Sequence, residues 1–137
     1  MLRFKNYTRN SLLMILLFYF TGCSQLTSIN MYSTSEEINL GNRYAFQIEK
    51  QLQLIYDPFI NDYINNLGQR LVRVSKRNNI KYTFKVVNDP AINAFAIPGG
   101  HCYVNLGLID FAETESELAS VIVHEIGHVV GEHGMEN

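Results

Sequence analysis

The spacing of hydrophobic residues along the chain predicts two helices, three strands and a further helix, in that order. The first helical pattern follows Ser33 and Thr34, each of which precedes a glutamate by three residues, the spacing of a capping box. We therefore expect a helix that begins near Glu36. Its buried stripe would consist of Ile38, Tyr44, Ala45, Ile48 and Leu52.

A second helix is predicted by its N-terminal signals, because Asp57 can cap the first turn and Pro58 suits its first position. Its hydrophobic spacing continues to a predicted end near Arg77. Six basic residues and no acidic residue lie between Arg70 and Lys85, and we interpret them as a solvated helix face and loop rather than a patch for lipid headgroups. The buried face of the helix would be lined by Ile60, Tyr63, Ile64, Leu67, Leu71 and Val74.

The middle of the chain has the pattern of strands. Residues 80–89, IKYTFKVVND, alternate in polarity and are rich in β-branched and aromatic side chains, which predicts a strand. Residues 93–110 contain two apolar runs around a Pro-Gly-Gly turn. This pattern predicts a β-hairpin in which Gly99 and Gly100 supply positive φ.

The last predicted helix opens with Thr114 and Glu117, which again have the capping-box spacing, and it runs into the motif HEIGH. We interpret Glu113, Glu115 and Glu117 as N-terminal acids favoured by the helix dipole rather than as metal ligands. Together the elements predict an α+β fold in which helices pack on a small β-sheet or hairpin.

Composition is that of a globular protein with one domain: 137 residues, 47% hydrophobic and 18% charged. The formal net charge of −2 includes Arg3, Lys5 and Arg9, and the remainder has eight basic and thirteen acidic side chains. Because nucleic-acid binding requires a basic face, we expect no nucleic-acid partner.

The N-terminus has the pattern of an export signal. A basic segment precedes SLLMILLFYF, an apolar run too short to span a bilayer, which needs roughly 20 residues. The following FTGC resembles the lipobox of bacterial lipoproteins, which implies a signal peptide over residues 1–22 and lipidation of Cys23. An ordinary signal peptide with a chance cysteine is the alternative. Residues 23–34 would then form a tether.

The residues around this cysteine also bear on location and on disulfides. Ser24 stands where an aspartate is associated with inner-membrane retention, so resemblance to sorting rules favours the periplasmic face of the outer membrane. If Cys23 is acylated, Cys102 has no disulfide partner, and we expect it to be buried in a strand.

The motif HEIGH carries the candidate chemistry. His124 and His128 are four residues apart, so on a helix their imidazoles lie on one face and can converge on one zinc ion. Glu125 would lie beside that ion, where it can accept a proton from the attacking water and later donate it to the departing amine. Aliphatic residues flank the pair on nearly all sides, which disfavours two solvated histidines on an amphipathic helix. The motif indicates hydrolysis of peptide bonds.

A catalytic zinc ion normally has three protein ligands, and the residues after HEIGH do not supply the third. The metzincin pattern requires a histidine six residues after His128, where the sequence has Gly134. His133 would point about 140° away from the zinc face of a continuous helix. Glu132 lies on the correct face but one further turn along. We therefore expect neither residue to bind the ion.

Two segments, NAFAIPGGHCYVNLGLI and ESELASVIVHEIGHVVGEHG, resemble the zinc peptidases of metallopeptidase family 48. That family includes the CAAX prenyl proteases, the HtpX membrane protease and periplasmic members, some of them lipoproteins. The resemblance implies a gluzincin arrangement, in which His124 and His128 bind one zinc ion, Glu125 is the catalytic base and a glutamate on a later helix is the third ligand. That glutamate has no counterpart in the sequence, so we expect residues 35–137 to be a partial catalytic domain without its C-terminal helices.

The resemblance also implies that the strand after the Pro-Gly-Gly turn is the edge strand beside the active-site cleft. An extended substrate could pair with this strand by β-augmentation. A purely structural hairpin is the alternative. The strand comprises His101, Cys102, Tyr103, Val104 and Asn105.

These features favour a zinc-dependent metalloendopeptidase, lipid-anchored in the bacterial cell envelope, that acts on proteins or peptides such as misfolded envelope proteins. The alternative is a catalytically inactive envelope lipoprotein that acts as a metal- or protein-binding module. Without covering helices, we expect Ile126, Val129 and Val130 to be partly exposed and the chain to be marginally stable and weakly active.

Overall fold

The computed structural model describes residues 33–131. The predicted signal peptide, Cys23 and nearly all of the tether lie outside the described residues, as do Glu132 and His133. None of the described helices is long and apolar enough to cross a membrane. The elements are α2 (Thr34–Glu49), α3 (Pro58–Val72), β1 (Thr83–Val87), β2 (Ala94–Ile97), β3 (His101–Asn105), α4 (Leu106–Phe111) and α5 (Glu115–Gly131).

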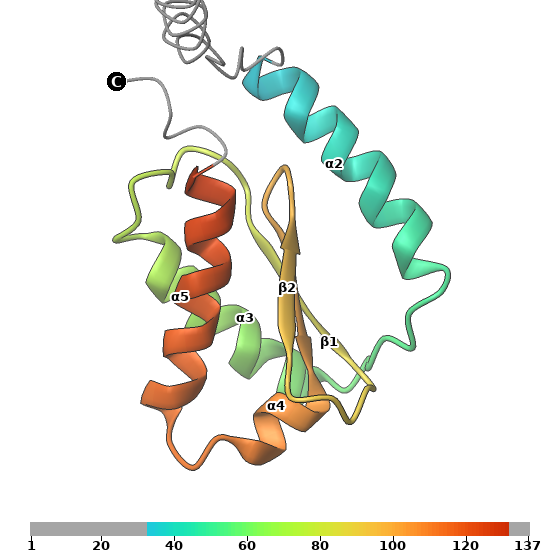
Figure 1. Ribbon diagram of the computed structural model, residues 1–137, viewed down its shortest axis with the longest axis vertical. Helices are drawn as coiled ribbons and strands as arrows, with labels where there is room; N and C mark the ends of the chain where they lie inside the picture. The colour runs from blue at the N-terminus through green and yellow to red at the C-terminus, as the bar shows by residue number, and fades with distance from the viewer. Residues whose placement is uncertain (1–32, 132–137) are drawn as a thin grey trace, which may run out of the picture.

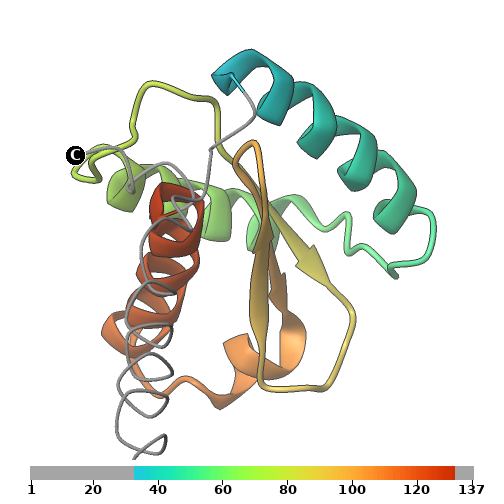
Figure 2. The ribbon, with the colours of Figure 1, turned by 45° about the horizontal axis from the view of Figure 1, so that its top comes forward.

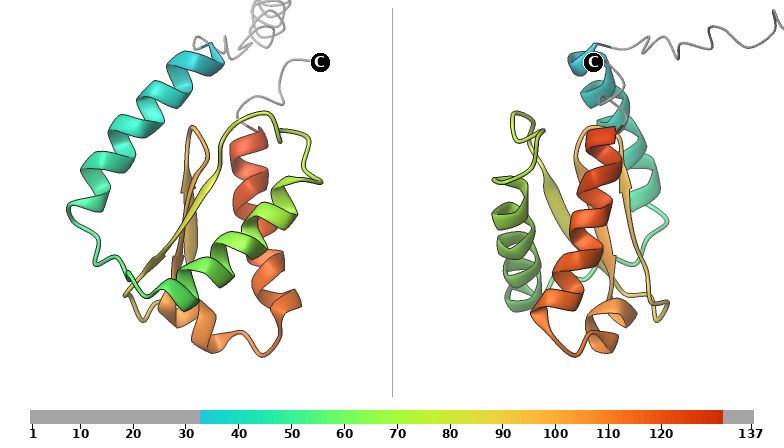
Figure 3. Two further views of the ribbon diagram at one scale, coloured as in Figure 1. Left: turned by 180° about the vertical axis from the view of Figure 1, so that it is seen from behind. Right: turned by 60° about the vertical axis from the view of Figure 1, so that its left-hand side comes forward.

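A three-stranded mixed sheet separates the long helices into two layers. Its strand order is β1-β3-β2, with β1 parallel to β3 and β2 antiparallel to β3. Helix α2 lies on one side of the sheet, and α3 and α5 lie on the other (Figures 1, 2 and 3). The predicted α+β fold is therefore confirmed.

The side chains of β3 show how the two layers are built. Cys102 belongs to the hydrophobic core that the sheet shares with α3 and α5. Its neighbours point to the other face: Tyr103 Oη donates to Glu49 Oε1 of α2 at 2.8 Å, and His101 Nε2 lies 2.9 Å from Asn42 Oδ1 of the same helix. The strand period of two thus separates an apolar core from polar contacts with α2.

The first two helices begin where the sequence predicts. Ser33 and Glu36 form a reciprocal capping box at the start of α2. Asp57 accepts hydrogen bonds of 2.9 and 3.3 Å from two amides in the first turn of α3, and Pro58 is the first residue of that helix. Both starts depend on residues within one turn of each other, which is why the sequence reveals them.

The predicted faces of these helices are partly wrong. Helix α3 ends at Val72 rather than near Arg77, so Val74 lies beyond it and is 85% exposed. In α2, Tyr44 is 55% exposed although the spacing predicted its burial. The helix instead contacts the rest of the fold through positions four residues apart. These buried positions are Glu37, Gly41 and Ala45.

Strands β2 and β3 form the predicted hairpin, and Gly99 and Gly100 in its turn have φ angles of 85° and 89°. The second apolar run does not remain extended, because the chain turns into α4 after Asn105. Gly107 packs so closely on Pro90 that a Cβ there would lie 2.1 Å from the proline carbonyl oxygen. Short apolar runs suit a helix or a strand equally, so the sequence pattern alone missed α4.

The prediction that His101–Asn105 is the edge strand is wrong. Strand β3 is the central strand and pairs with β1 on one side and β2 on the other. Both of its edges are occupied, so an extended substrate cannot pair with it. The edge strand on the α5 side is β2, Ala94–Ile97. The hairpin pattern does not reveal that β1 joins β3 in parallel, because this pairing links residues about 18 positions apart.

A buried ion pair joins distant parts of the fold. Arg77 Nη1 and Nη2 donate to Glu37 Oε1 and Oε2 at 2.9 and 2.5 Å, and the two side chains are 7% and 8% exposed. Arg77 Nη1 also donates to the Val129 carbonyl of α5 at 2.7 Å. The Gly99 amide donates to Glu37 Oε1 at 3.2 Å. Arg77 is therefore not part of a solvated basic face, and it connects α2, the hairpin turn and the end of α5.

Candidate active site

Helix α5 is held at its start by a side-chain cap. The Glu117 amide donates to Thr114 Oγ1 at 3.2 Å, as the capping-box spacing predicts. The reciprocal contact is shifted by one residue, because Glu117 Oε2 accepts from the Glu113 amide at 2.9 Å. Arg70 of α3 forms an exposed ion pair of 2.7 Å with Glu115. These contacts fix the first turn of the helix that carries HEIGH.

One face of α5 is almost completely buried against the core. Its buried residues recur every three or four positions and are Leu118, Ile122, Ile126 and Val129. The prediction that Ile126 and Val129 are partly exposed is therefore wrong, because α3 and the sheet cover them. Val130 is partly buried.

His124 and His128 lie on the exposed side of α5. Their Nε2 atoms are 3.0 Å apart, and their rings are nearly perpendicular, with centroids separated by 4.5 Å. A tetrahedral zinc ion bound to two imidazole nitrogens at about 2.0–2.1 Å would hold those nitrogens about 3.3 Å apart. The two histidines are therefore close to the arrangement that a shared metal ion requires.

Glu125 completes the cluster. The ligand atoms of His124, Glu125 and His128 all lie within 4.8 Å of one another, and Glu125 is partly buried. Within residues 33–131, no other histidine, cysteine, aspartate or glutamate joins this group. Two imidazoles suit metal binding, and the carboxylate beside them suits proton transfer.

Aliphatic residues do not surround the histidines, contrary to the prediction from the sequence. The buried stripe of α5 lies on the opposite side, and the histidine side includes Val123, which is 49% exposed. A Cβ added at Gly127 would meet no atom within 4 Å. This face is open to solvent, and the close approach of the two imidazole nitrogens, rather than burial, is what indicates a metal site.

Cys102 lies close enough to Glu125 for the two to interact but is not part of the cluster. Its thiol is free and buried in β3, as predicted. Burial, together with the negative charge of Glu125, raises the pKa of the Cys102 thiol to about 12. The thiol therefore stays protonated near neutral pH and is a poor metal ligand.

The other residues predicted for substrate binding have structural contacts instead. Tyr103, Val104 and Asn105 are at most 5% exposed. His101 Nδ1 lies 3.1 Å from Thr83 Oγ1, and its other ring nitrogen contacts α2. The strand edge beside α5 belongs to β2, which the sequence pattern did not single out. Strand order depends on contacts between distant segments, so no local signal could have identified it.

Comparison with known proteins places the chain among peptidases. The family model described as Peptidase family M48 matches residues 58–137. The beta-barrel assembly-enhancing protease of Yersinia pestis is 42% identical over 101 residues, which cover 74% of this chain and 21% of that protein. The protein of the same name from Escherichia coli (strain K12) is 41% identical over 103 residues, 74% of this chain and 21% of its own length.

A eukaryotic protein is also similar. The mitochondrial metalloendopeptidase OMA1 of Schizosaccharomyces pombe is 35% identical over 74 residues, 54% of this chain and 22% of that protein. The chain thus spans about a fifth of the length of these curated relatives. Because the family match covers more than half of the chain and includes α3, the sheet and the whole HEIGH motif, the chain belongs to peptidase family M48.

Proposed function

We propose that this protein is a zinc-dependent metalloendopeptidase of the bacterial cell envelope. The observation that carries the proposal is the 3.0 Å separation of the His124 and His128 Nε2 atoms, with the Glu125 carboxylate in the same cluster. Membership of peptidase family M48 supports the same reaction class. The gluzincin-type arrangement is part of the proposal, with two histidine ligands and a further glutamate ligand that residues 33–131 do not place in the cluster.

Each residue of the cluster has one role. His124 and His128 would hold the zinc ion through Nε2, and the arrangement of α5 keeps both rings on one side of the helix. Zinc, when bound, would polarise the peptide carbonyl and activate the attacking water. The Glu125 carboxylate would accept the proton of that water and pass it to the nitrogen of the departing amine.

Substrates and location are proposed from the neighbouring strand and from the relatives. The outer edge of β2 lies beside α5, so an extended polypeptide paired with β2 would pass the HEIGH motif. Relatives from Yersinia pestis and Escherichia coli are named beta-barrel assembly-enhancing proteases, which supports protein substrates in the envelope. Lipidation of Cys23, at the periplasmic face of the outer membrane, would supply the membrane anchor.

Hydrolysis of casein by the purified chain tests the reaction. Zinc-loaded wild-type protein is expected to hydrolyse casein. The rate for Glu125→Gln is expected to be lower by about a hundredfold or more, since general acid–base catalysis typically accelerates a reaction by that factor. Glu113→Gln, an exposed glutamate before α5, is the matched control and should retain the wild-type rate.

Zinc content measured on the same samples separates catalysis from metal binding. Glu125→Gln should keep the wild-type zinc content, whereas His124→Ala and His128→Ala should lose it. Equal casein hydrolysis by wild type and Glu125→Gln would refute the proposed mechanism. Zinc binding without any hydrolysis would favour the metal- or protein-binding module instead.

A further inference from the structure

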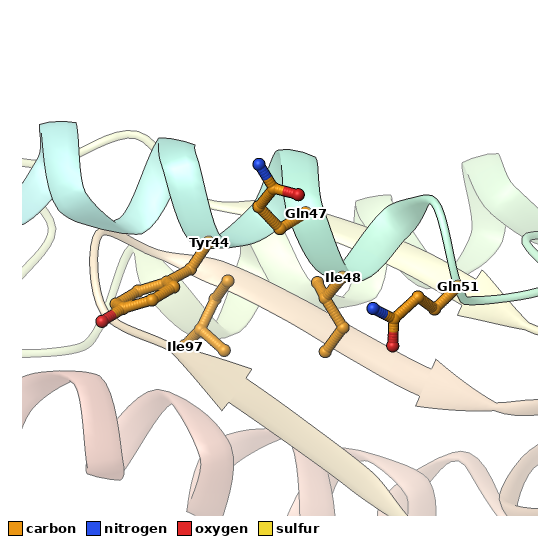
Figure 4. A pocket seen from close by; sticks show the side chains of 5 residues that line it. All are labelled: Tyr44, Gln47, Ile48, Gln51 and Ile97. Carbon is orange, nitrogen blue, oxygen red and sulfur yellow. The ribbon is translucent and has the colours of Figure 1, made fainter.

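A groove of about 300 Å³ lies between α2 and β2, on the opposite side of the edge strand from α5. Figure 4 shows the residues that line it, with Ile97 contributed by β2 and the others by the C-terminal part of α2 and by Gln51, two residues after the end of that helix. None of the lining side chains is charged. They are Tyr44, Gln47, Ile48, Gln51 and Ile97.

The apolar part of this lining is incompletely used by the fold. Helical spacing predicts that Tyr44 and Ile48 are core residues, yet Tyr44 is 55% exposed and Ile48 is only partly buried. Ile97 is also partly buried. An aromatic ring and two branched aliphatic side chains thus remain accessible at one place, which favours contact with another apolar group.

The groove is continuous with a free strand edge. Among the described strands, β2 has a partner on one side only, so its outer edge can pair with an extended peptide. Side chains of directly paired residues point to the same face of a sheet. A peptide residue opposite Ile97 would therefore point to the α2 side, into the groove, and the residues on either side of it would point towards α5.

The same end of β2 lies near the C-terminal half of α5. Gly99, two residues after Ile97, donates to Glu37, and Glu37 is paired with Arg77, which holds the Val129 carbonyl. Val129 directly follows His128. A peptide paired with β2 would thus place one side chain in the groove and its neighbouring side chains on the face of the sheet that α5 covers (Figure 1).

We propose that the groove between α2 and β2 binds an uncharged, apolar side chain of an extended peptide substrate, and that its five lining residues determine this specificity. The inference rests on the proposed peptidase function for the identity of the ligand. Its contacts are nevertheless separate from the metal-binding residues. Two isoleucines and the face of a tyrosine suit an aliphatic or aromatic side chain, and two neutral glutamines offer no counter-ion to a charged one.

Peptide binding tests the groove without requiring catalysis. Short fluorescein-labelled alanine–threonine peptides with one central Leu, Lys or Asp are titrated with the full chain carrying Glu125→Gln, and fluorescence anisotropy is recorded. The Leu peptide is expected to bind about tenfold more tightly than the Lys or Asp peptide, because the groove removes much of one aliphatic side chain from water.

A charge change in the lining should alter this preference. Gln47 and Gln51 are exposed, so the double variant Gln47→Glu/Gln51→Glu is expected to fold normally. It should bind the Lys peptide about fivefold more tightly than the parent chain with both glutamines does. The matched control, Asn39→Asp/Gln53→Glu, adds the same charge at exposed positions outside the groove. It should leave the order of the three peptides unchanged.

The groove inference is overturned if the three peptides bind equally, if none binds, or if both double variants change the preference alike. Failure of the peptidase proposal would give a different experimental result. In that case casein hydrolysis would not depend on Glu125, while the preference for the Leu peptide would persist.

Discussion

Arg77 is a buried charged residue that joins two helices far apart in the sequence. Its guanidinium is buried, forms a two-pronged pair with Glu37 and also holds the last turn of α5 through the Val129 carbonyl. Removal of one partner from such a pair leaves the other charge buried without compensation. The position therefore matters for stability and for the placement of the turn that contains His128.

Arg77→Ala is expected to lower the free energy of unfolding by about 3–5 kcal/mol, because it removes the positive charge that compensates the buried Glu37 carboxylate. Arg77→Lys keeps the charge but not the planar guanidinium, so it should lower the free energy of unfolding by less than Arg77→Ala does. Urea unfolding followed by circular dichroism measures both. Arg73→Ala, at an exposed arginine, should change stability by no more than about 0.5 kcal/mol. If Arg77→Ala lowers the free energy of unfolding by no more than this control does, the buried ion pair between Arg77 and Glu37 does not stabilise the fold.

Glu49 connects α2 to the polar face of the sheet and makes stability depend on pH. Burial by itself would raise the pKa of Glu49, but hydrogen bonds from Lys85 Nζ at 2.7 Å and Tyr103 Oη at 2.8 Å outweigh burial and lower the pKa below its ordinary value of 4.5. A carboxyl whose pKa is lower in the folded state stabilises the fold above its unfolded pKa. That stabilisation disappears as the pH falls through the folded pKa.

Glu49→Gln is therefore expected to be less stable than wild type at neutral pH and to approach wild-type stability as the pH falls from about 5 to about 3. The measurement is the urea midpoint of both proteins across this pH range. Glu113→Gln serves as the control at an exposed position. A stability difference between wild type and Glu49→Gln that stays constant across the range would show that Glu49 does not titrate as its contacts require.

At the scale of elements, two helical glycines have opposite surroundings. In α2, a Cβ at Gly41 would lie 1.9 Å from the Pro98 carbonyl oxygen, so this glycine allows the helix to pack on the hairpin turn. In α5, a Cβ at Gly127 would meet nothing within 4 Å. The same substitution should therefore have opposite effects in the two helices.

Gly41→Ala is expected to destabilise the protein by about 1–3 kcal/mol or more, because α2 must move away from the turn. Gly127→Ala is expected to stabilise it by about 0.5–1 kcal/mol, since alanine loses less backbone entropy in a helix. Thermal and urea unfolding of the two variants supply the comparison. Changes of equal sign would mean that the close contact of α2 with the hairpin turn is absent in solution.

Elements whose signals are local were predictable, and elements that depend on packing were not. The caps at Ser33 and Asp57 and the Gly99-Gly100 turn all depend on residues within one turn, and all are confirmed. Helix α4 was missed because its short apolar run has no period that distinguishes helix from strand.

At the scale of the whole molecule, metal binding should couple to stability. A ligand that binds only the folded state stabilises it, by about 2.7 kcal/mol at one hundred times its dissociation constant. Both candidate ligands belong to α5, whose other face is part of the core, so a bound ion should stabilise the fold as a unit.

Zinc is therefore expected to raise the melting temperature of the chain, and a chelator should reverse the rise. His124→Ala and His128→Ala should each lose most of this shift, because each leaves only one imidazole to bind the ion. His101→Gln, a histidine on the other side of the sheet, should retain it whatever its own melting temperature. An equal zinc-induced shift in all four proteins would place the metal elsewhere.

The sequence by itself determined the features that depend on neighbouring residues. These are the starts of α2 and α3, the hairpin turn, the α+β class, and the spacing of His124, Glu125 and His128 that a helix converts into one cluster. The tertiary structure alone decided that β3 is central and β2 lies at the edge, that Arg77 is buried against Glu37, and that Tyr44 borders a groove. The physical reason is the same in each case: these outcomes depend on contacts between residues 18 or more positions apart, and local spacing contains no information about which distant segments meet.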